Sequence, residues 1–401
     1  MFQFKKKESI IKYKIIYTIF ILFIYLIGKS LPLYMVDLSA YMHKSIDAEA
    51  LIMQTISGDI YQCSLFALGI SPYMISSMIV QVITSCKKAE THARTSPKKT
   101  NKMVLAMTLM VAILQAVMQV QDLQFNVAGD ELVLAKIVAV FEMIAGVMII
   151  LWLSSRNKKY GIGGQSALIL VNVIDGIIAT LKGHEIMELF LPLAVSFVVL
   201  VLMVIMENAE MRIPLQRISI HNIYADKNYL AIKLNPIGVM PAMFSTAFFM
   251  VPQLLIALFV WIFPENNELV WMQNHMSLSE PFGIVIYVLL LYCLTIGFSR
   301  IFVNPKEITE QYLKSGDSFV NLHAGTDTRK YLSKVINHIS FFSATIMALC
   351  LGIPLILQMM GEINSSLVTL PSSVMMLTGI WCNLYREVNA IKDLEAYEPF
   401  I

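Results

Sequence analysis

The chain has 401 residues, of which 57% are hydrophobic and only 14% are charged, and its formal net charge is +2. This composition excludes an ordinary soluble protein, because globular domains carry about 25% charged residues. With a mean hydropathy of +0.67, membrane-spanning helices must make up much of the chain. The five cysteines lack a CxxC pair, which argues against a disulfide framework or a cysteine-based metal site.

Ten apolar runs are long enough to be interpreted as spans of an all-α, multi-pass membrane protein. They cover residues 15–34, 63–84, 103–120, 132–153, 166–181, 189–206, 237–263, 281–303, 335–357 and 370–385. No small-residue cleavage pattern follows the first run, so we expect it to remain as an anchor.

Lysine and arginine indicate the orientation of these spans, because cytoplasmic loops retain both residues. If the N-terminus is cytoplasmic, 26 of the 30 lysines and arginines fall in cytoplasmic segments, and only Lys29, Lys44, Lys136 and Lys182 fall outside. This asymmetry predicts a protein of the cytoplasmic membrane with an even number of spans and both termini in the cytoplasm.

Glycine and proline interrupt two of the spans. The second span is broken at Gly69 and Pro72, and the seventh is broken at Pro236 and Pro241. Backbone groups that are freed at bilayer depth must be satisfied by protein or by water, so broken spans are expected beside a pathway rather than against lipid.

Each broken span is the second of five, which suits two related five-span halves with a site between them. We expect an N-terminal half at 1–188 and a C-terminal half at 189–401. Two cytoplasmic loops of the second half, 207–233 and 304–334, are long enough to carry structure of their own.

The second of these loops has the signature of a short helix. Asn304 is an N-cap candidate, Pro305 follows at the first helical position, Glu307 lies in the first turn and Gly316 ends the pattern. These residues predict a helix that projects into the cytoplasm.

Five segments stand out in their order along the chain: LFALGISPYM (65–74), YGIGGQSALIL (160–170), RIPLQR (212–217), KLNPIGVMPAMF (233–244) and NPKE with the following KSG (304–307 and 314–316). Together they resemble the SecY family of protein-conducting channels. The resemblance covers nearly the whole chain and depends on the combination of motifs. It implies a clamshell of two five-helix halves around an hourglass pore, with a lateral gate between the second and seventh spans.

The resemblance also implies roles for individual residues. The lateral gate would include Gly69, Pro72, Ser76, Pro236, Pro241 and Thr246. A pore ring, or hydrophobic constriction, would be formed by Ile70, Met74, Leu170, Met243 and Met376. A plug would lie at 50–63 and include Thr55, Ser57 and Gly58. Methionine suits the ring because its flexible chain can seal around varied passing segments.

Basic residues in the two long loops are candidates for binding a SecA-type motor ATPase: Arg212, Arg217, His323, Arg329 and Lys330. The family's GIRPG element appears here as NLHAG, so His323 replaces the usual arginine. An arginine is permanently charged and a histidine is mostly neutral at pH 7, so this departure argues against standard motor docking. Together with the modest length and the trimmed inner loops, it favours the accessory Sec branch of Gram-positive bacteria over the housekeeping channel. That branch implies export of large serine-rich, often glycosylated, surface proteins.

The expected partners are therefore the motor ATPase, small SecE- and SecG-like membrane subunits, accessory Sec proteins, the exported preprotein and membrane lipids, without nucleic acid. No cofactor and no metal is expected, and no phosphate-binding loop is present. An ion-coupled secondary transporter is the main alternative, with Glu142 and Asp175 as its few intramembrane carboxylates. An intramembrane enzyme would need a catalytic constellation that the sequence lacks, and the broken spans argue against a passive scaffold.

Overall fold

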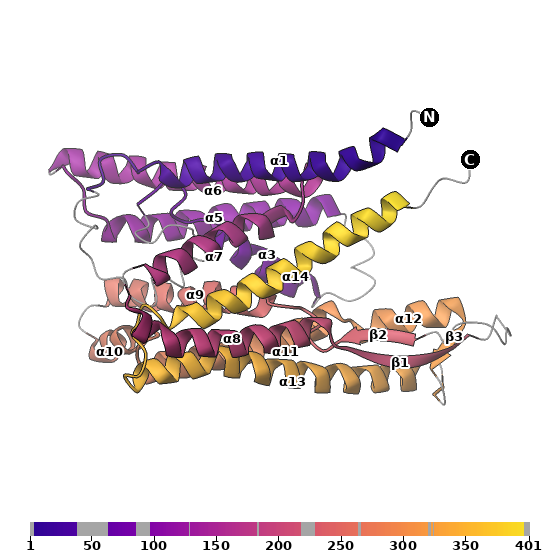
Figure 1. Ribbon diagram of the computed structural model, residues 1–401. Helices are drawn as coiled ribbons and strands as arrows, with labels where there is room; N and C mark the ends of the chain where they lie inside the picture. Colours follow the sequence, from indigo (N-terminus) through magenta and orange to yellow (C-terminus); the bar gives the residue numbers. More distant parts are fainter. Residues whose placement is uncertain are drawn as a thin grey trace.

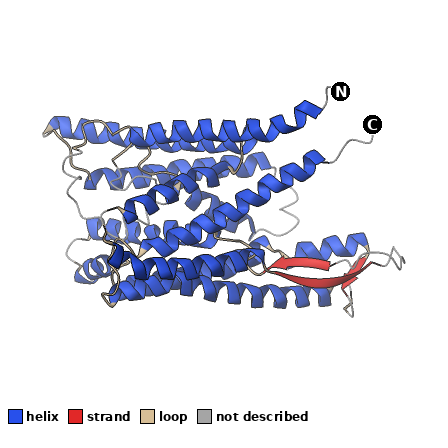
Figure 2. Ribbon diagram, in the orientation of Figure 1, coloured by secondary structure: helices blue, strands red, loops and turns tan. Residues whose placement is uncertain are grey.

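The structure is a computed structural model that describes residues 4–37, 63–85, 97–127, 129–182, 184–217, 229–263, 266–319, 322–323 and 325–396. The molecule is an elongated bundle of helices with its strands gathered at one end (Figures 1 and 2). We call this the sheet end. The first helix begins and the last helix ends at the sheet end (Figure 1), as an even number of spans requires.

Within the described residues, one helix corresponds to each of the ten predicted spans. These helices are α1 (Phe4–Ser30), α3 (Ser71–Ser85), α5 (Pro97–Asp122), α6 (Asp130–Tyr160), α7 (Gly164–Leu181), α8 (Ile186–Asn208), α9 (Met240–Ile262), α11 (Pro281–Phe302), α13 (Thr326–Met359) and α14 (Thr369–Ala396). By length and composition alone, α1, α5, α6, α7, α8, α11 and α13 contain candidate membrane spans. The all-α, ten-helix prediction is confirmed, and the protein is a multi-pass membrane protein.

The two predicted breaks shorten the second and seventh spans at their first residues. Residues 65–70 form a turn in which Gly69 has φ +54°, a left-handed conformation that glycine adopts at little cost. Helix α3 therefore has only 15 residues. Before α9, residues 234–239 form an irregular segment, and Pro241 lies in the first turn of the helix, where proline is tolerated.

The helices contact one another in two consecutive series. Among the earlier helices, α5 contacts α3 and α6, while α1 and α6 both contact α7. Among the later ones, α8 contacts α14, and α11 contacts α9 and α13. The two series are joined by contacts of α3 with α9 and of α14 with both α7 and α1. The broken spans are therefore direct neighbours.

The two long loops pair with each other in a small three-stranded sheet. Its strands are β1 (Glu210–Arg217), β2 (Tyr229–Lys233) and β3 (Asp317–Phe319), in the order β2-β1-β3. Both pairings are antiparallel, with Met211 opposite Ile232 and Gln216 opposite Ser318. Buried side chains join the sheet to α13: Ile213, Ile232, Phe319, Leu332, Ile336 and Ile339. The sequence analysis did not anticipate this sheet.

Two shorter helices complete the architecture. Helix α12 (Pro305–Ser315) is the predicted short helix: the Asn304 side chain accepts a hydrogen bond from the Lys306 amide at 3.2 Å, and Gly316 ends the helix with φ +75°. Helix α10 (Asn267–His275) lies at the opposite end of the bundle (Figure 1). It was not predicted, because no capping pattern was recognised in that loop.

Candidate functional site

The contact between α3 and α9 contains the predicted gate residues. Ser76 of α3 is fully buried, and its hydroxyl donates to the Pro72 carbonyl of the same helix at 2.7 Å. Ser245 of α9 is also buried and donates to the Ala242 carbonyl at 2.8 Å. Both hydroxyl protons are thus used within their own helices. Thr246 lies on α9, and its side chain is outside the described part of the structure.

Apolar side chains fill the region beside this contact. Four predicted ring residues are buried in one hydrophobic cluster, and Leu170 of α7 packs against it as a half-buried residue. The four are Ile70 in the turn before α3, Met74 in α3, Met243 in α9 and Met376 in α14. The fold therefore brings all five residues into one apolar core, although their role as a ring stays a prediction. The predicted plug residues Thr55, Ser57 and Gly58 lie outside the described residues.

The predicted motor-binding residues come together at the sheet end. Arg212 is exposed on β1, with its guanidinium 4.8 Å from the centre of the Tyr229 ring on β2. Arg217 pairs in register with Asp317 of β3. His323 is exposed before α13, and Arg329 and Lys330 are exposed in its first turns. The sheet, which packs against α13, thus brings segments of the two loops together at this end of the molecule.

Both intramembrane carboxylates have polar partners near the end of the first helix: one lies in α1 itself and the other in the segment that follows it. Asp175 of α7 forms an ion pair with Lys29 of α1, with 2.5 Å between Oδ2 and Nζ. Glu142 of α6 accepts a hydrogen bond from the Tyr34 amide at 2.9 Å. These contacts give both acids a structural role and leave little support for the alternative of an ion-coupled transporter.

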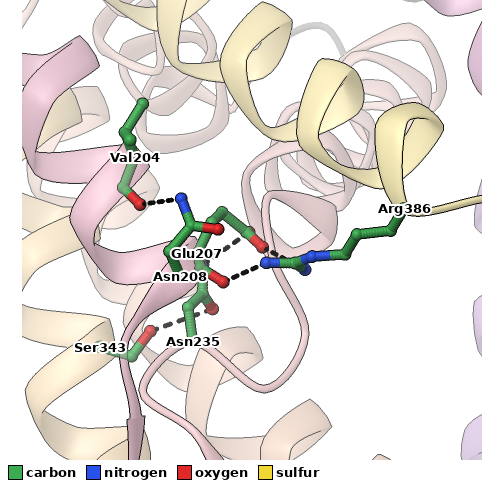
Figure 3. Close-up of polar contacts among 6 residues, drawn as sticks. All are labelled: Val204, Glu207, Asn208, Asn235, Ser343 and Arg386. Carbon is green, nitrogen blue, oxygen red and sulfur yellow. Dashed lines mark hydrogen bonds and ion pairs between the residues drawn. The ribbon is translucent and has the colours of Figure 1, made fainter. Parts of the chain in front are cut away.

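A buried polar cluster lies where α8 meets the sheet (Figure 3). Glu207, at the end of α8, is only 1% exposed. Arg386 of α14 donates from Nη1 to Glu207 Oε2 at 3.2 Å and from Nη2 to the Glu207 carbonyl. Asn235, just before α9, contacts Glu207 Oε1 at 3.5 Å and accepts a hydrogen bond from Ser343 of α13 at 3.2 Å.

The buried cluster connects the sheet to the gate helix. Strand β1 begins three residues after Glu207, and β2 ends two residues before Asn235, which precedes α9. A charge at this depth is costly unless it is paired, so the Glu207 pair holds α8, the start of α9 and α14 in one arrangement.

Sequence analysis missed both members of this pair. Glu207 was counted as the first residue of a polar loop, and Arg386 as an ordinary cytoplasmic arginine. The available signal was an acid placed directly at the end of an 18-residue apolar run. Among the described residues, no group of three or more histidine, cysteine or acidic side chains could hold a metal ion.

Comparison with known proteins places this arrangement in a family. An "Accessory Sec system protein translocase subunit SecY2" of Streptococcus agalactiae serotype III (strain NEM316) is 29% identical over 401 residues, which cover 98% of this chain and 96% of the relative. The protein with the same description from Streptococcus sanguinis (strain SK36) is 28% identical, with 98% and 99% covered.

Solved structures share the fold at lower identity. "The structure of a protein conducting channel" aligns with a TM-score of 0.68 and 16% identity over 96% of this chain and 93% of that one. "Sec61 in the Canine ribosome-channel complex from the endoplasmic reticulum" aligns with a TM-score of 0.63, 16% identity and the same two coverages. The family model described as SecY matches residues 64–385. The chain therefore belongs to the SecY family.

Proposed function

We propose that the chain is the channel subunit of an accessory Sec translocase, through which unfolded polypeptides cross the cytoplasmic membrane. One observation carries the proposal: two spans that are broken at their first residues, α3 and α9, lie in contact beside an apolar core. The names of the full-length relatives support it. No bond is made or broken in this role, so the chain is not an enzyme.

The proposed path lies between the half that contains residues 1–188 and the half that contains residues 189–401. The ring residues close this path, because an apolar constriction excludes water and ions. Separation of α3 from α9 opens it sideways. Gly69 and Pro72 limit α3 to 15 residues, and Pro236 and Pro241 set the start of α9, so the two helices meet over no more than the length of α3.

The sheet end is the proposed cytoplasmic surface. Arg212, Arg217, His323, Arg329 and Lys330 form a surface for an acidic face of a SecA-type ATPase, which supplies the energy. Small SecE- and SecG-like membrane subunits and accessory Sec proteins complete the assembly. The proposed substrates are large serine-rich surface proteins, often glycosylated.

Reconstitution tests this function. The chain, its small subunits and the SecA-type ATPase of the same cell are placed in lipid vesicles, and a preprotein is added outside together with ATP. Protease-protected preprotein should accumulate in the vesicles and should be absent when the chain is omitted. ATP-independent uptake of a small solute along an ion gradient, without protection of any preprotein, would instead favour the transporter alternative.

A further inference from the structure

One stretch of α14, from Gly379 to Glu387, contacts both series of helices. Residues three or four apart share a face of a helix. Gly379 and Arg386 belong to one face, and Leu384 and Glu387 belong to the neighbouring face. Helix α14 crosses α7 and α8 (Figure 1) and contacts both.

The first face holds the start of the gate helix. A Cβ at Gly379 would overlap Val239 Cγ1, so only glycine allows α14 to approach the residue that precedes α9 this closely. Seven residues further along, Arg386 donates to both the carboxylate and the main-chain carbonyl of Glu207. Packing thus joins α14 to the residue before α9, while the ion pair joins α14 to the end of α8, where Asn235 contacts Glu207.

The second face holds a loop of the earlier helices. The Gly163 amide, between α6 and α7, donates to Glu387 Oε2 at 3.0 Å. Gly163 has φ +77°, and a Cβ there would overlap Leu384 Cδ2. The loop itself is ordered by the buried Asn157 side chain, which donates to the carbonyls of Ile162 and Gly164, each at 2.9 Å.

The polar contacts on the two faces of α14 differ in the free energy needed to break them. Glu207 is 1% exposed, so breaking its pair would strand a charge away from water, which is strongly unfavourable. Glu387 is exposed, so water can replace its hydrogen bond to Gly163 at little cost. The contact with the end of α8 is therefore strongly held, whereas the hydrogen bond to the 161–163 loop can be released.

We propose that Arg386 and Glu387 are positioning residues for the gate: Arg386 fixes α14 to the end of α8, beside Asn235 and the start of α9, and Glu387 acts as a releasable latch to the opposite half. Opening of the gate then requires release of the Glu387 latch, while α14, the end of α8 and the start of α9 move as one body. This inference rests on the proposed lateral gate between α3 and α9.

The latch is tested by the rate at which a cysteine pair across the gate, Ser76→Cys with Thr246→Cys, forms a disulfide in the absence of the motor. The protein is the full chain with its small subunits in lipid vesicles. Glu387→Ala should shift the equilibrium between the closed and the open gate about threefold toward the open state, the change that an exposed charged contact supports, and should thereby slow disulfide formation. Glu387→Gln keeps a carbonyl acceptor and should retain most of the wild-type rate. Asp393→Ala, which removes another exposed acid from α14, is the matched control.

The fixed contact is tested sterically. Gly379→Ala should push the start of α9 away and slow the same disulfide, and Val239→Ala in the same protein should partly restore the rate by removing the overlapping methyl groups. Equal rates for Glu387→Ala, Asp393→Ala and the cysteine-pair protein without a further change would overturn the latch even if the oxidised pair blocks export. If the oxidised pair leaves export unchanged, the lateral gate itself is wrong. If Gly379→Ala does not fold, the disulfide rate of Glu387→Ala alone tests the proposal.

Discussion

Arg386 and Glu207 lie 179 positions apart and share two hydrogen bonds, one through the carboxylate at 3.2 Å and one through the Glu207 main-chain carbonyl. The arginine side chain is 31% exposed and the carboxylate side chain 1% exposed. The arginine can therefore reach water when the pair is broken, whereas the carboxylate cannot. The free energy of unfolding should therefore fall when the arginine is removed and the carboxylate is left unpaired.

We expect Arg386→Gln to destabilise the protein by about 3 kcal/mol, because it leaves a buried carboxylate unpaired. The double variant Glu207→Gln with Arg386→Gln should be less destabilised than Arg386→Gln alone, since no buried charge remains. The free energy of unfolding in mixed micelles measures both. The control is Asp175→Asn, whose more exposed pair with Lys29 should contribute about 1 kcal/mol or less. A double variant at least as unstable as Arg386→Gln would contradict this account.

The lateral gate predicts that joining α3 to α9 stops transport. A chain whose five natural cysteines are replaced should carry Ser76→Cys and Thr246→Cys, and oxidation should block export until a reductant is added. Each single cysteine variant is the control and should export normally under oxidation. Normal export with the pair fully oxidised would rule out movement between these helices.

If the ring residues form an apolar constriction, a polar side chain placed in it should let ions pass. Replacing Ile70 or Met376 with Asn should raise the resting ion conductance, because an amide in a hydrophobic constriction favours wetting. Met376→Leu keeps the volume and the apolar character and should remain tight. Conductance is recorded in planar bilayers. Wild-type conductance in both Asn variants would remove these residues from the ring.

Orientation is tested by labelling. Single cysteines at Asn101, near the start of α5, and at Asn267, in α10, lie at opposite ends of the bundle. An impermeant thiol reagent outside intact cells should label Asn267→Cys and spare Asn101→Cys, because lysine and arginine are retained inside. The opposite pattern would invert the proposed topology.

Local signals in the sequence were sufficient for much of the fold. Helix α12 was predicted because its cap residues, Asn304 and Gly316, act on their own immediate backbone. The breaks at Gly69 and Pro241 were visible for the same reason, since glycine and proline restrict or permit conformations locally.

Features that depend on distant partners were not predictable in this way. Strand β1 pairs with β3 across about a hundred residues of chain. Its sequence, EMRIPLQR, has apolar residues at alternate positions, but the proline in its middle removes a backbone donor and argues against a paired strand. The pairing of Glu207 with Arg386 likewise requires α8 and α14 to be neighbours. The ring residues were named only through the family resemblance, because buried methionines are common in this chain.

The sheet provides the final prediction, which concerns the motor. Because opposite charges attract through a screened field, affinity for an acidic partner surface should fall as salt rises past roughly 0.15 M, where the screening length is about 8 Å. Arg217→Glu with Arg329→Glu should weaken ATPase binding and reduce its salt dependence, while membrane insertion remains intact. Both residues belong to elements that the sheet holds together, so they should act on one partner surface.

The matched control is Lys158→Glu with Lys159→Glu, which reverses two exposed charges at the end of α6, on the cytoplasmic side of the proposed topology but away from the sheet. If cytoplasmic charge acted only by fixing the topology, both double variants would bind the motor equally well. A loss of affinity confined to the Arg217 and Arg329 variant would locate the motor surface on the sheet. Equal affinity and equal salt dependence in wild type and both variants would exclude it, and the basic loops would then serve orientation alone.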